Sequence, residues 1–101
     1  MNGGDLFKKP LGSGDKFMLY MNQLEDNISV DEWQKASATY EKLHRAWKKI
    51  VPRIQFSVEK DEINAIDVNL ARLKSCISSR DKTLGLLELN EAREHWHDLN
   101  R

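Results

Sequence analysis

Two Glu-x-x-His segments carry the side chains of this chain that come closest to a chemical site. They run from Glu41 to His44 and from Glu94 to His97. Carboxylate-bridged di-iron bundles use this spacing, together with a glutamate from each remaining helix, and all the ligands point into the bundle. If the neighbouring apolar residues occupy core positions a and d, Glu41 falls at b and His44 at e, whereas Glu94 and His97 fall at f and b. Three of the four side chains should therefore face solvent, and we do not expect a buried di-metal site.

A weaker form of metal binding stays open as an alternative function. In this alternative, the helices bind a small ligand or a divalent metal ion at their surface through Glu41, His44, His95 or His97. Imidazole and carboxylate groups are ligands that such ions accept. The sequence indicates no organic cofactor.

A cluster of basic residues beside Trp47 is the second chemical candidate. Four of its members share one helical stripe, namely Lys42, Arg45, Lys49 and Arg53. Cations next to an aromatic side chain are typical of a surface that binds phosphate or nucleic acid. However, 16 basic and 16 acidic residues give a formal net charge of zero, so no overall field attracts a polyanion. We expect a solvated helix face and no nucleic-acid partner.

Other catalytic patterns are absent from the sequence. There is no glycine-rich phosphate loop, no Cys-x-x-Cys pair, no His-Glu-x-x-His run and no serine in a nucleophile elbow. His44 could accept a proton, but a histidine on the flank of a helix is more often a solvated or packing residue. The single cysteine, Cys76, excludes an internal disulfide and should be a small buried hydrophobe. We therefore predict that the protein is not an enzyme.

The elements that must position these residues are helices, because apolar residues recur at alternating steps of three and four. The three seams are Trp33, Ala36, Tyr40, Leu43, Trp47 and Ile50; Ile63, Ile66, Leu70, Leu73 and Ile77; and Leu89, Ala92, Trp96 and Leu99. A shorter segment before them is apolar on more than one side and holds Phe17, Met18, Tyr20, Met21, Leu24 and Ile28. These patterns predict an all-α fold, a small antiparallel up-down four-helix bundle with a short first helix.

Local signals indicate where the first helices begin and end. Asp15 can cap the first helix, and Ser29 with Glu32 forms a capping box that should start the second helix near Val30. Pro52 lacks a backbone N–H, so we expect a kink or a stop between residues 51 and 56.

Similar signals follow for the last two helices. Ser57 offers a cap for a third helix from about Val58 to Ile77. Asp81 or Ser79 can cap a fourth helix that reaches almost to the end of the chain.

The charges indicate how the two middle helices pair. Basic residues crowd the end of the second predicted helix and acidic residues crowd the start of the third: Lys42, Arg45, Lys48, Lys49 and Arg53, then Glu59, Asp61, Glu62 and Asp67. An antiparallel hairpin brings these parts side by side, so that opposite charges face each other and both helix dipoles are complemented. We expect this hairpin to be the backbone of the fold.

The first 14 residues differ in composition from the rest of the chain. They hold four of the five glycines and one of the two prolines, and they cannot bury enough apolar surface to offset their ordering entropy. We predict a flexible leader over residues 1–14 and a single helical domain over residues 15–101. No apolar run approaches the roughly 20 residues that span a bilayer, and the leader lacks the apolar core of a signal peptide.

Spare apolar side chains suggest a contact with another protein. Met18 and Met21 have flexible side chains that suit adaptable contacts, and Trp47 lies among basic residues. These three residues are the candidate interaction site, and burial of both methionines within one chain would argue against it. The seams could also continue across a subunit boundary and form a homodimer.

The order of these elements resembles a family of small helical proteins from Gram-positive bacteria that is a domain of unknown function. The resemblance rests on the tryptophan seam, the charged hairpin at 59–66, the apolar stretch at 70–77, and Arg80–Asp81 before a leucine-rich helix, and it covers Ser29 to Leu99. It carries over no catalytic residue. It implies an N-terminal membrane anchor or lipoprotein signal, and hence an extracytoplasmic domain tethered to the membrane.

This chain departs from the family pattern because it begins with the glycine-rich leader, which looks like the tether that would follow a removed signal. We therefore expect a non-enzymatic interaction or structural domain, displayed outside the cytoplasmic membrane, with another protein as its partner. Membrane contact would come only through a tether absent from this chain, and a cytoplasmic location is the alternative.

Overall fold

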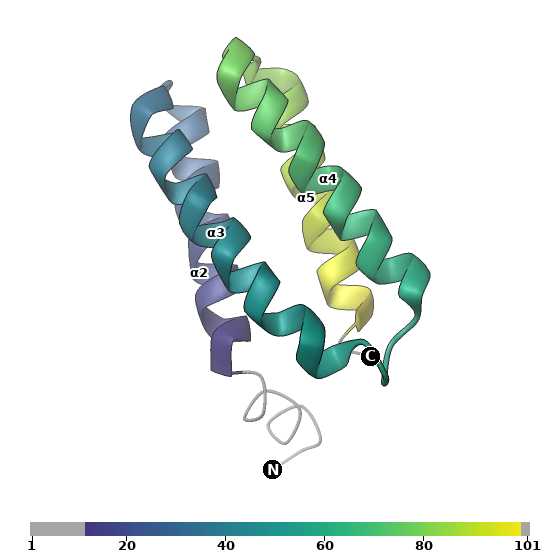
Figure 1. Ribbon diagram of the computed structural model, residues 1–101. Coiled ribbons are helices and arrows are strands. Elements are labelled where there is room, and N and C mark those ends of the chain that lie inside the picture. Colours follow the sequence, from purple (N-terminus) through teal and green to yellow (C-terminus); the bar gives the residue numbers. More distant parts are fainter. Residues whose placement is uncertain (1–11, 100–101) are drawn as a thin grey trace.

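The computed structural model describes residues 12–99, and within that range the chain forms four α-helices and no strand. The helices are α2 (Gly12–Ser29), α3 (Trp33–Ile54), α4 (Lys60–Ser79) and α5 (Lys82–Leu99), joined by short turns (Figure 1). The predicted all-α class is confirmed. Residues 1–11 of the predicted leader lie outside the described residues. The first helix begins at Gly12, three residues before the predicted cap at Asp15.

The helices run up, down, up and down, so that consecutive helices are antiparallel (Figure 1). The contacts are most extensive within the pairs α2–α3 and α4–α5, and they are sparser between α2 and α5 and between α3 and α4. The molecule is therefore two helical hairpins packed side by side, with overall dimensions of 39 × 25 × 18 Å. The expectation that the α3–α4 hairpin is the backbone of the fold is wrong, because α3 makes its main contact with α2.

The predicted seams form the core. All of their members are buried except Trp33, which is partly buried at the start of α3. From α2, the fully buried side chains are Phe17, Met21, Leu24 and Ile28. Burial of these apolar side chains is the main favourable term in folding, worth roughly 1.5–3 kcal/mol for each large one.

An aromatic cluster joins the two hairpins at the end of the bundle where α2 begins. The Phe17 ring lies 5.5 Å from Trp47 of α3 and 4.7 Å from Trp96 of α5, measured between centroids. The two indoles meet edge to face at 6.5 Å. Such tilted arrangements are favourable beyond the area they bury, so this cluster holds three of the four helices together.

Two hydrogen bonds, one buried and one partly buried, specify how α3 meets α4. The Tyr40 hydroxyl donates to the Leu70 carbonyl at 2.8 Å, and the Trp47 indole N–H donates to Asp67 at 2.7 Å. Each buried polar group thereby finds a partner, which buried groups of this kind need.

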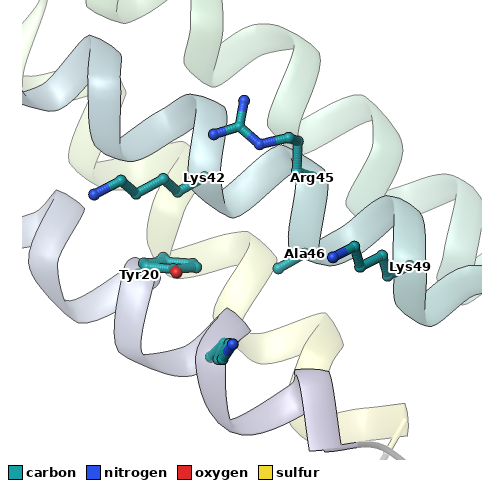
Figure 2. Close-up of a pocket in the computed structure, with 6 residues that line it drawn as sticks. Tyr20, Lys42, Arg45, Ala46 and Lys49 are labelled. Carbon is teal, nitrogen blue, oxygen red and sulfur yellow. The ribbon is translucent and has the colours of Figure 1, made fainter.

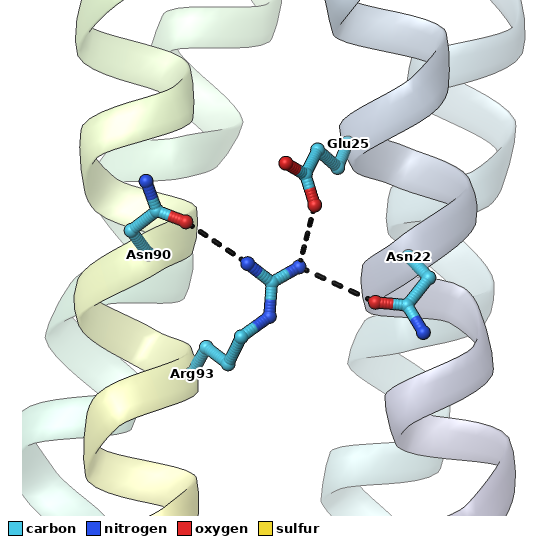
Figure 3. A network of polar contacts seen from close by, with 4 residues as sticks. All are labelled: Asn22, Glu25, Asn90 and Arg93. Atoms are coloured by element: carbon cyan, nitrogen blue, oxygen red, sulfur yellow. Dashed lines mark hydrogen bonds and ion pairs between the residues drawn. The ribbon is translucent and has the colours of Figure 1, made fainter.

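A polar network closes the bundle between its first and last helices (Figure 3). The Arg93 guanidinium donates to Glu25 at 2.8 Å and more weakly to Asn22 at 3.4 Å, both on α2, and to Asn90 of its own helix at 2.9 Å. Partial burial of this side chain, which is 22% exposed, strengthens the contact relative to a fully solvated ion pair.

Two of the predicted capping signals are wrong. Ser29 ends α2 instead of capping the next helix; α3 starts at Trp33 after Glu32, which makes no side-chain cap hydrogen bond. The reason is the tight turn between them, where Asp31 adopts a left-handed conformation with φ of 62°. Ser57 likewise donates back to the Ile54 carbonyl instead of capping α4.

The boundary signals at Pro52 and Asp81 are confirmed, whereas Asp15, the predicted cap of the first helix, lies inside α2. Pro52 lies inside the last turn of α3, which ends two residues later at Ile54, within the predicted interval. Asp81 caps α5, because its carboxylate accepts a hydrogen bond from the Leu84 backbone N–H at 3.0 Å. Such a cap contributes about 1 kcal/mol to helix stability.

Candidate functional site

A hollow between α2 and α3 gathers several basic side chains, and we call it the basic hollow. Its volume is about 290 Å³, and it is lined by Lys16, Tyr20, Lys42, Arg45, Ala46 and Lys49. Figure 2 shows Lys42, Arg45 and Lys49 projecting from α3 and the Tyr20 ring projecting from α2, with Arg45 extending away from Tyr20. Three of its four cations, Lys42, Arg45 and Lys49, belong to the basic stripe of α3 that the sequence shows. The fourth, Lys16, comes from α2.

Among the residues that the structure describes, the cations of the basic hollow have no acidic partner. Between residues 16 and 99, none of Lys16, Lys42, Arg45 and Lys49 forms an ion pair with another side chain. Helix α3 carries six basic residues and one acidic residue, so this charge is local even though the whole chain is neutral. Four unpaired cations around one concave surface give a positive potential that favours an anionic group.

The predicted charge pairing across the α3–α4 hairpin therefore fails for these cations. Lys42, Arg45 and Lys49 line a surface shared with α2. On α4, Asp67 accepts from Trp47, and Glu62 contacts His95 of α5. Glu62 and Asp67 thus serve other contacts, and the basic side chains stay available to solvent.

A second hollow continues the same surface along α2 and α3. Its volume is about 310 Å³, and its lining residues are Gln23, Asp26, Asn27, Lys35, Ala38, Thr39 and Lys42. Lys42 lines both hollows. From Lys35 to Lys49 the helix rises about 21 Å, which is the length of about six extended residues. The surface is thus long enough for a peptide segment and exceeds the size of a single phosphate group.

The two Glu-x-x-His segments do not converge on one site. Glu41, Glu94 and His97 are exposed and His44 is partly buried, as the heptad positions predict. The His44 ring stacks on Tyr40 of the preceding turn, with centroids 5.9 Å apart and an interplanar angle of 11°.

A different acid–histidine group forms between α4 and α5. One ligand atom each from Glu62, His95 and Asp98 lies within 4.8 Å of the others. His95 is among the histidines that the sequence suggests for surface metal binding, but its partners are not. An i, i+3 spacing on α5 relates His95 to Asp98, and only the antiparallel pairing of α4 with α5 brings Glu62 beside them.

The candidate interaction residues occupy different environments. Met21 is 0% exposed and Trp47 is 1% exposed, so neither presents a surface to a partner in this conformation. Met18 is partly buried and packs against the core. Among the predicted three, only Met18 retains accessible surface.

Cys76 is 8% exposed, in keeping with the predicted small buried hydrophobe. Burial raises the pKa of its thiol, and the negative charges of Asp81 and Glu88 raise it further. Because the reactive species is the thiolate, these effects make Cys76 a poor nucleophile.

Comparison with known proteins places the chain in a family. A family model described as Domain of unknown function (DUF4363) matches residues 11–100. The chain belongs to the DUF4363 family. The predicted membership of a domain of unknown function is confirmed, and the match begins earlier than the Ser29 at which the resemblance starts. No match was found among curated proteins or among solved structures.

The DUF4363 match covers the four described helices. The two hairpins, the basic hollow and its continuation along α2 and α3 therefore lie inside the family domain. Among the helices that the structure describes, none combines the length and apolar character needed to cross a bilayer.

Proposed function

We propose that this DUF4363 domain is a non-enzymatic binding domain whose partner is another protein, and that an acidic segment of that partner docks in the basic hollow. The observation that carries the proposal is that four cations line one hollow and form no ion pair within the described part of the chain. Cations held in this way lower the free energy of a bound carboxylate without first breaking an existing ion pair.

The shape of the surface supports a peptide as the occupant. The basic hollow and its continuation form a track along α2 and α3 with Tyr20 and Ala46 as apolar contacts and Asn27 and Thr39 as polar ones. The Thr39 hydroxyl already donates to Asn27 at 2.8 Å. An acidic extended segment or helix could place carboxylates at the cationic end and neutral side chains along the rest.

Peptide binding with charge reversal tests the proposal. A fluorescent ten-residue peptide rich in Glu and Asp is titrated with the whole chain, and anisotropy is measured at low and at physiological salt. For the variant Lys42→Glu/Lys49→Glu we expect affinity to fall about tenfold or more, because one lost charge-assisted contact is worth roughly 1.5–3 kcal/mol. Binding by the wild type should weaken with added salt.

The matched control is Lys60→Glu/Lys74→Glu, which changes the net charge by the same amount on the exposed surface of α4. We expect it to retain most of the affinity. An equal loss of peptide affinity in both variants would show that only the net charge matters, and it would overturn the assignment of binding to the basic hollow. If the chain binds vesicles of anionic lipid but does not bind the acidic peptide, the proposal of a protein partner is overturned.

We also propose that the domain lies outside the cytoplasmic membrane on an N-terminal tether. The composition of residues 1–11, which include Gly3, Gly4 and Pro10, suits a spacer and supports this location. Protease added to intact cells that express the full reading frame should digest the domain, while a cytoplasmic marker stays intact. Protection of the domain until the cells are lysed would favour the cytoplasmic alternative.

A homodimer is proposed as a further association of this chain. Sedimentation of the whole chain across a range of concentrations tests it: a mass near twice 11.8 kDa supports the dimer, and a constant monomer mass contradicts it.

A further inference from the structure

We propose that Glu62, His95 and Asp98 bind a divalent transition-metal ion of the Zn²⁺ type at the junction of α4 and α5. The three residues come from the first turn of α4 and the last two turns of α5. One ligand atom from each lies within 4.8 Å of the others, and each residue is partly buried. The site uses neither α2 nor α3, so it is independent of the proposed peptide surface.

The spacing of these atoms suits a single ion after a small adjustment. A Zn²⁺ ion with bonds of about 2.0–2.2 Å to nitrogen and oxygen has ligand atoms roughly 3.3 Å apart. His95 Nδ1 already lies 3.1 Å from Glu62 Oε1. A small approach of the three ligand atoms, which already lie within 4.8 Å of one another, would complete a triangle of ligands, and water would fill the fourth position.

The chemistry of the donor set indicates the class of ion. Two carboxylates and one neutral imidazole supply two negative charges, which match a divalent cation. An imidazole ligand favours Zn²⁺, Co²⁺ or Ni²⁺ over Mg²⁺ and Ca²⁺, which take oxygen ligands in larger numbers.

A hollow beside the site gives an ion access to two of the three ligands. Glu62 and Asp98 line a hollow of about 470 Å³ at the turn between α3 and α4, together with Glu59. Phe56 also lines this hollow and is 93% exposed, so the turn leaves the hollow open to solvent. Glu59, which directly precedes α4, adds a third carboxylate to the lining of this hollow and increases the local attraction for cations.

Calorimetric titration of the tag-free whole chain with ZnCl₂ tests the site. We expect one saturable binding event per chain, and Co²⁺ should give the visible absorption bands of a four-coordinate ion. His95→Gln and Glu62→Gln should each lower the Zn²⁺ affinity by about 10–100-fold or more. Mutation of a residue that only hydrogen-bonds to a metal ligand already lowers affinity by that factor. Mg²⁺ at the same concentration should give no comparable signal.

The control is Glu94→Gln/His97→Gln, which removes the neighbouring exposed carboxylate and imidazole of α5 and should leave binding unchanged. Far-UV circular dichroism shows whether each variant keeps its helices; because the two site substitutions are independent, either folded variant decides the result. Absence of saturable binding, or an equal loss in the control, would overturn the proposal. Failure of the metal-site proposal would leave the separate proposal of peptide binding at the basic hollow unaffected.

Discussion

Tyr40 carries its phenol group into the contact between α3 and α4, where the residue is 4% exposed. The hydroxyl donates a hydrogen bond to the Leu70 carbonyl at 2.8 Å. Burial, with a smaller effect from the negative charge of Glu41, raises the pKa of this hydroxyl from 10.0 to about 12. The folded state therefore holds the Tyr40 proton more tightly than the unfolded state does.

This difference predicts a loss of stability at high pH. Because the folded pKa is the higher one, the stabilisation is complete below pH 10 and is lost as the pH rises from 10 to about 12. We expect Tyr40→Phe to unfold more easily at pH 7, by about 1 kcal/mol for the lost hydrogen bond, and to lose less stability than the wild type between pH 9 and 11.5. Urea unfolding across that range measures both effects.

Tyr20→Phe is the matched control, since it removes a hydroxyl from a partly buried ring of α2. It should keep the steep loss of stability at high pH that the wild type shows. Parallel stability curves for Tyr40→Phe and the wild type would contradict the role assigned to the Tyr40 proton.

Gly85 shows how one position limits the stability of a whole element. It lies in the first turn of α5 and is buried against α2 and α4. A methyl group added there would lie 3.6 Å from both Cys76 Cβ and Ile28 Cδ1, which is ordinary van der Waals contact. The backbone of Gly85 does not have a positive φ, so no conformational reason requires glycine.

We therefore expect Gly85→Ala to stabilise the protein by about 0.5–1 kcal/mol, because alanine is the better helix former and restricts the unfolded chain. The measurement is the urea midpoint at an unchanged m-value. Gly85→Leu provides the contrast: its larger side chain would overpack the same contact and should destabilise by about 1–3 kcal/mol. Destabilisation by the alanine would show that the contact has no room for a methyl group.

The helices themselves were predictable because burial follows periodicity. Every member of the three seams except Trp33 is buried, and the cap at Asp81 is formed as predicted. The capping box at Ser29 failed because three residues must reverse the chain there. That reversal leaves Asp31 in a left-handed conformation, which a local pattern of hydroxyl and carboxylate does not specify.

The pairing of helices was less predictable than their positions. Charge patterns suggested that α3 faces α4 along the basic stripe, whereas Lys42 and Lys49 line a hollow with α2. The spacing of side chains along one helix indicates which residues share a face, but it does not indicate which neighbouring helix packs on that face. Apolar packing decides that choice, and here the buried side chains of α2 and α3 give the more extensive contact.

Both candidate sites depend on the arrangement of the whole molecule, so the sequence could supply only part of each. The basic stripe of α3 was visible, but Lys16 joins it only after α2 folds back. His95 was visible as a surface histidine, but Glu62 lies 33 residues away and reaches it through the α4–α5 pairing. Interactions across such separations leave no periodic signal in a single chain.

The aromatic cluster decides whether the two hairpins behave as one unit. Phe17 is 0% exposed and contacts Trp47 and Trp96, whereas Phe56, in the turn between α3 and α4, is 93% exposed. Removing a buried phenyl ring leaves a cavity as well as losing transfer energy. We expect Phe17→Ala to destabilise the protein by about 3–5 kcal/mol, and Phe56→Ala to change stability by less than about 0.5 kcal/mol.

Urea unfolding followed by both tryptophan fluorescence and far-UV circular dichroism measures this prediction. For the wild type the two transitions should coincide, since the indoles report the contact between hairpins and the dichroism reports the helices. A total stability of about 5–15 kcal/mol is typical of a domain this size, so Phe17→Ala removes a large share of it. If fluorescence changes well before the helices unfold, the hairpins separate as independent units, and the sparser contacts between them are too weak to couple their folding.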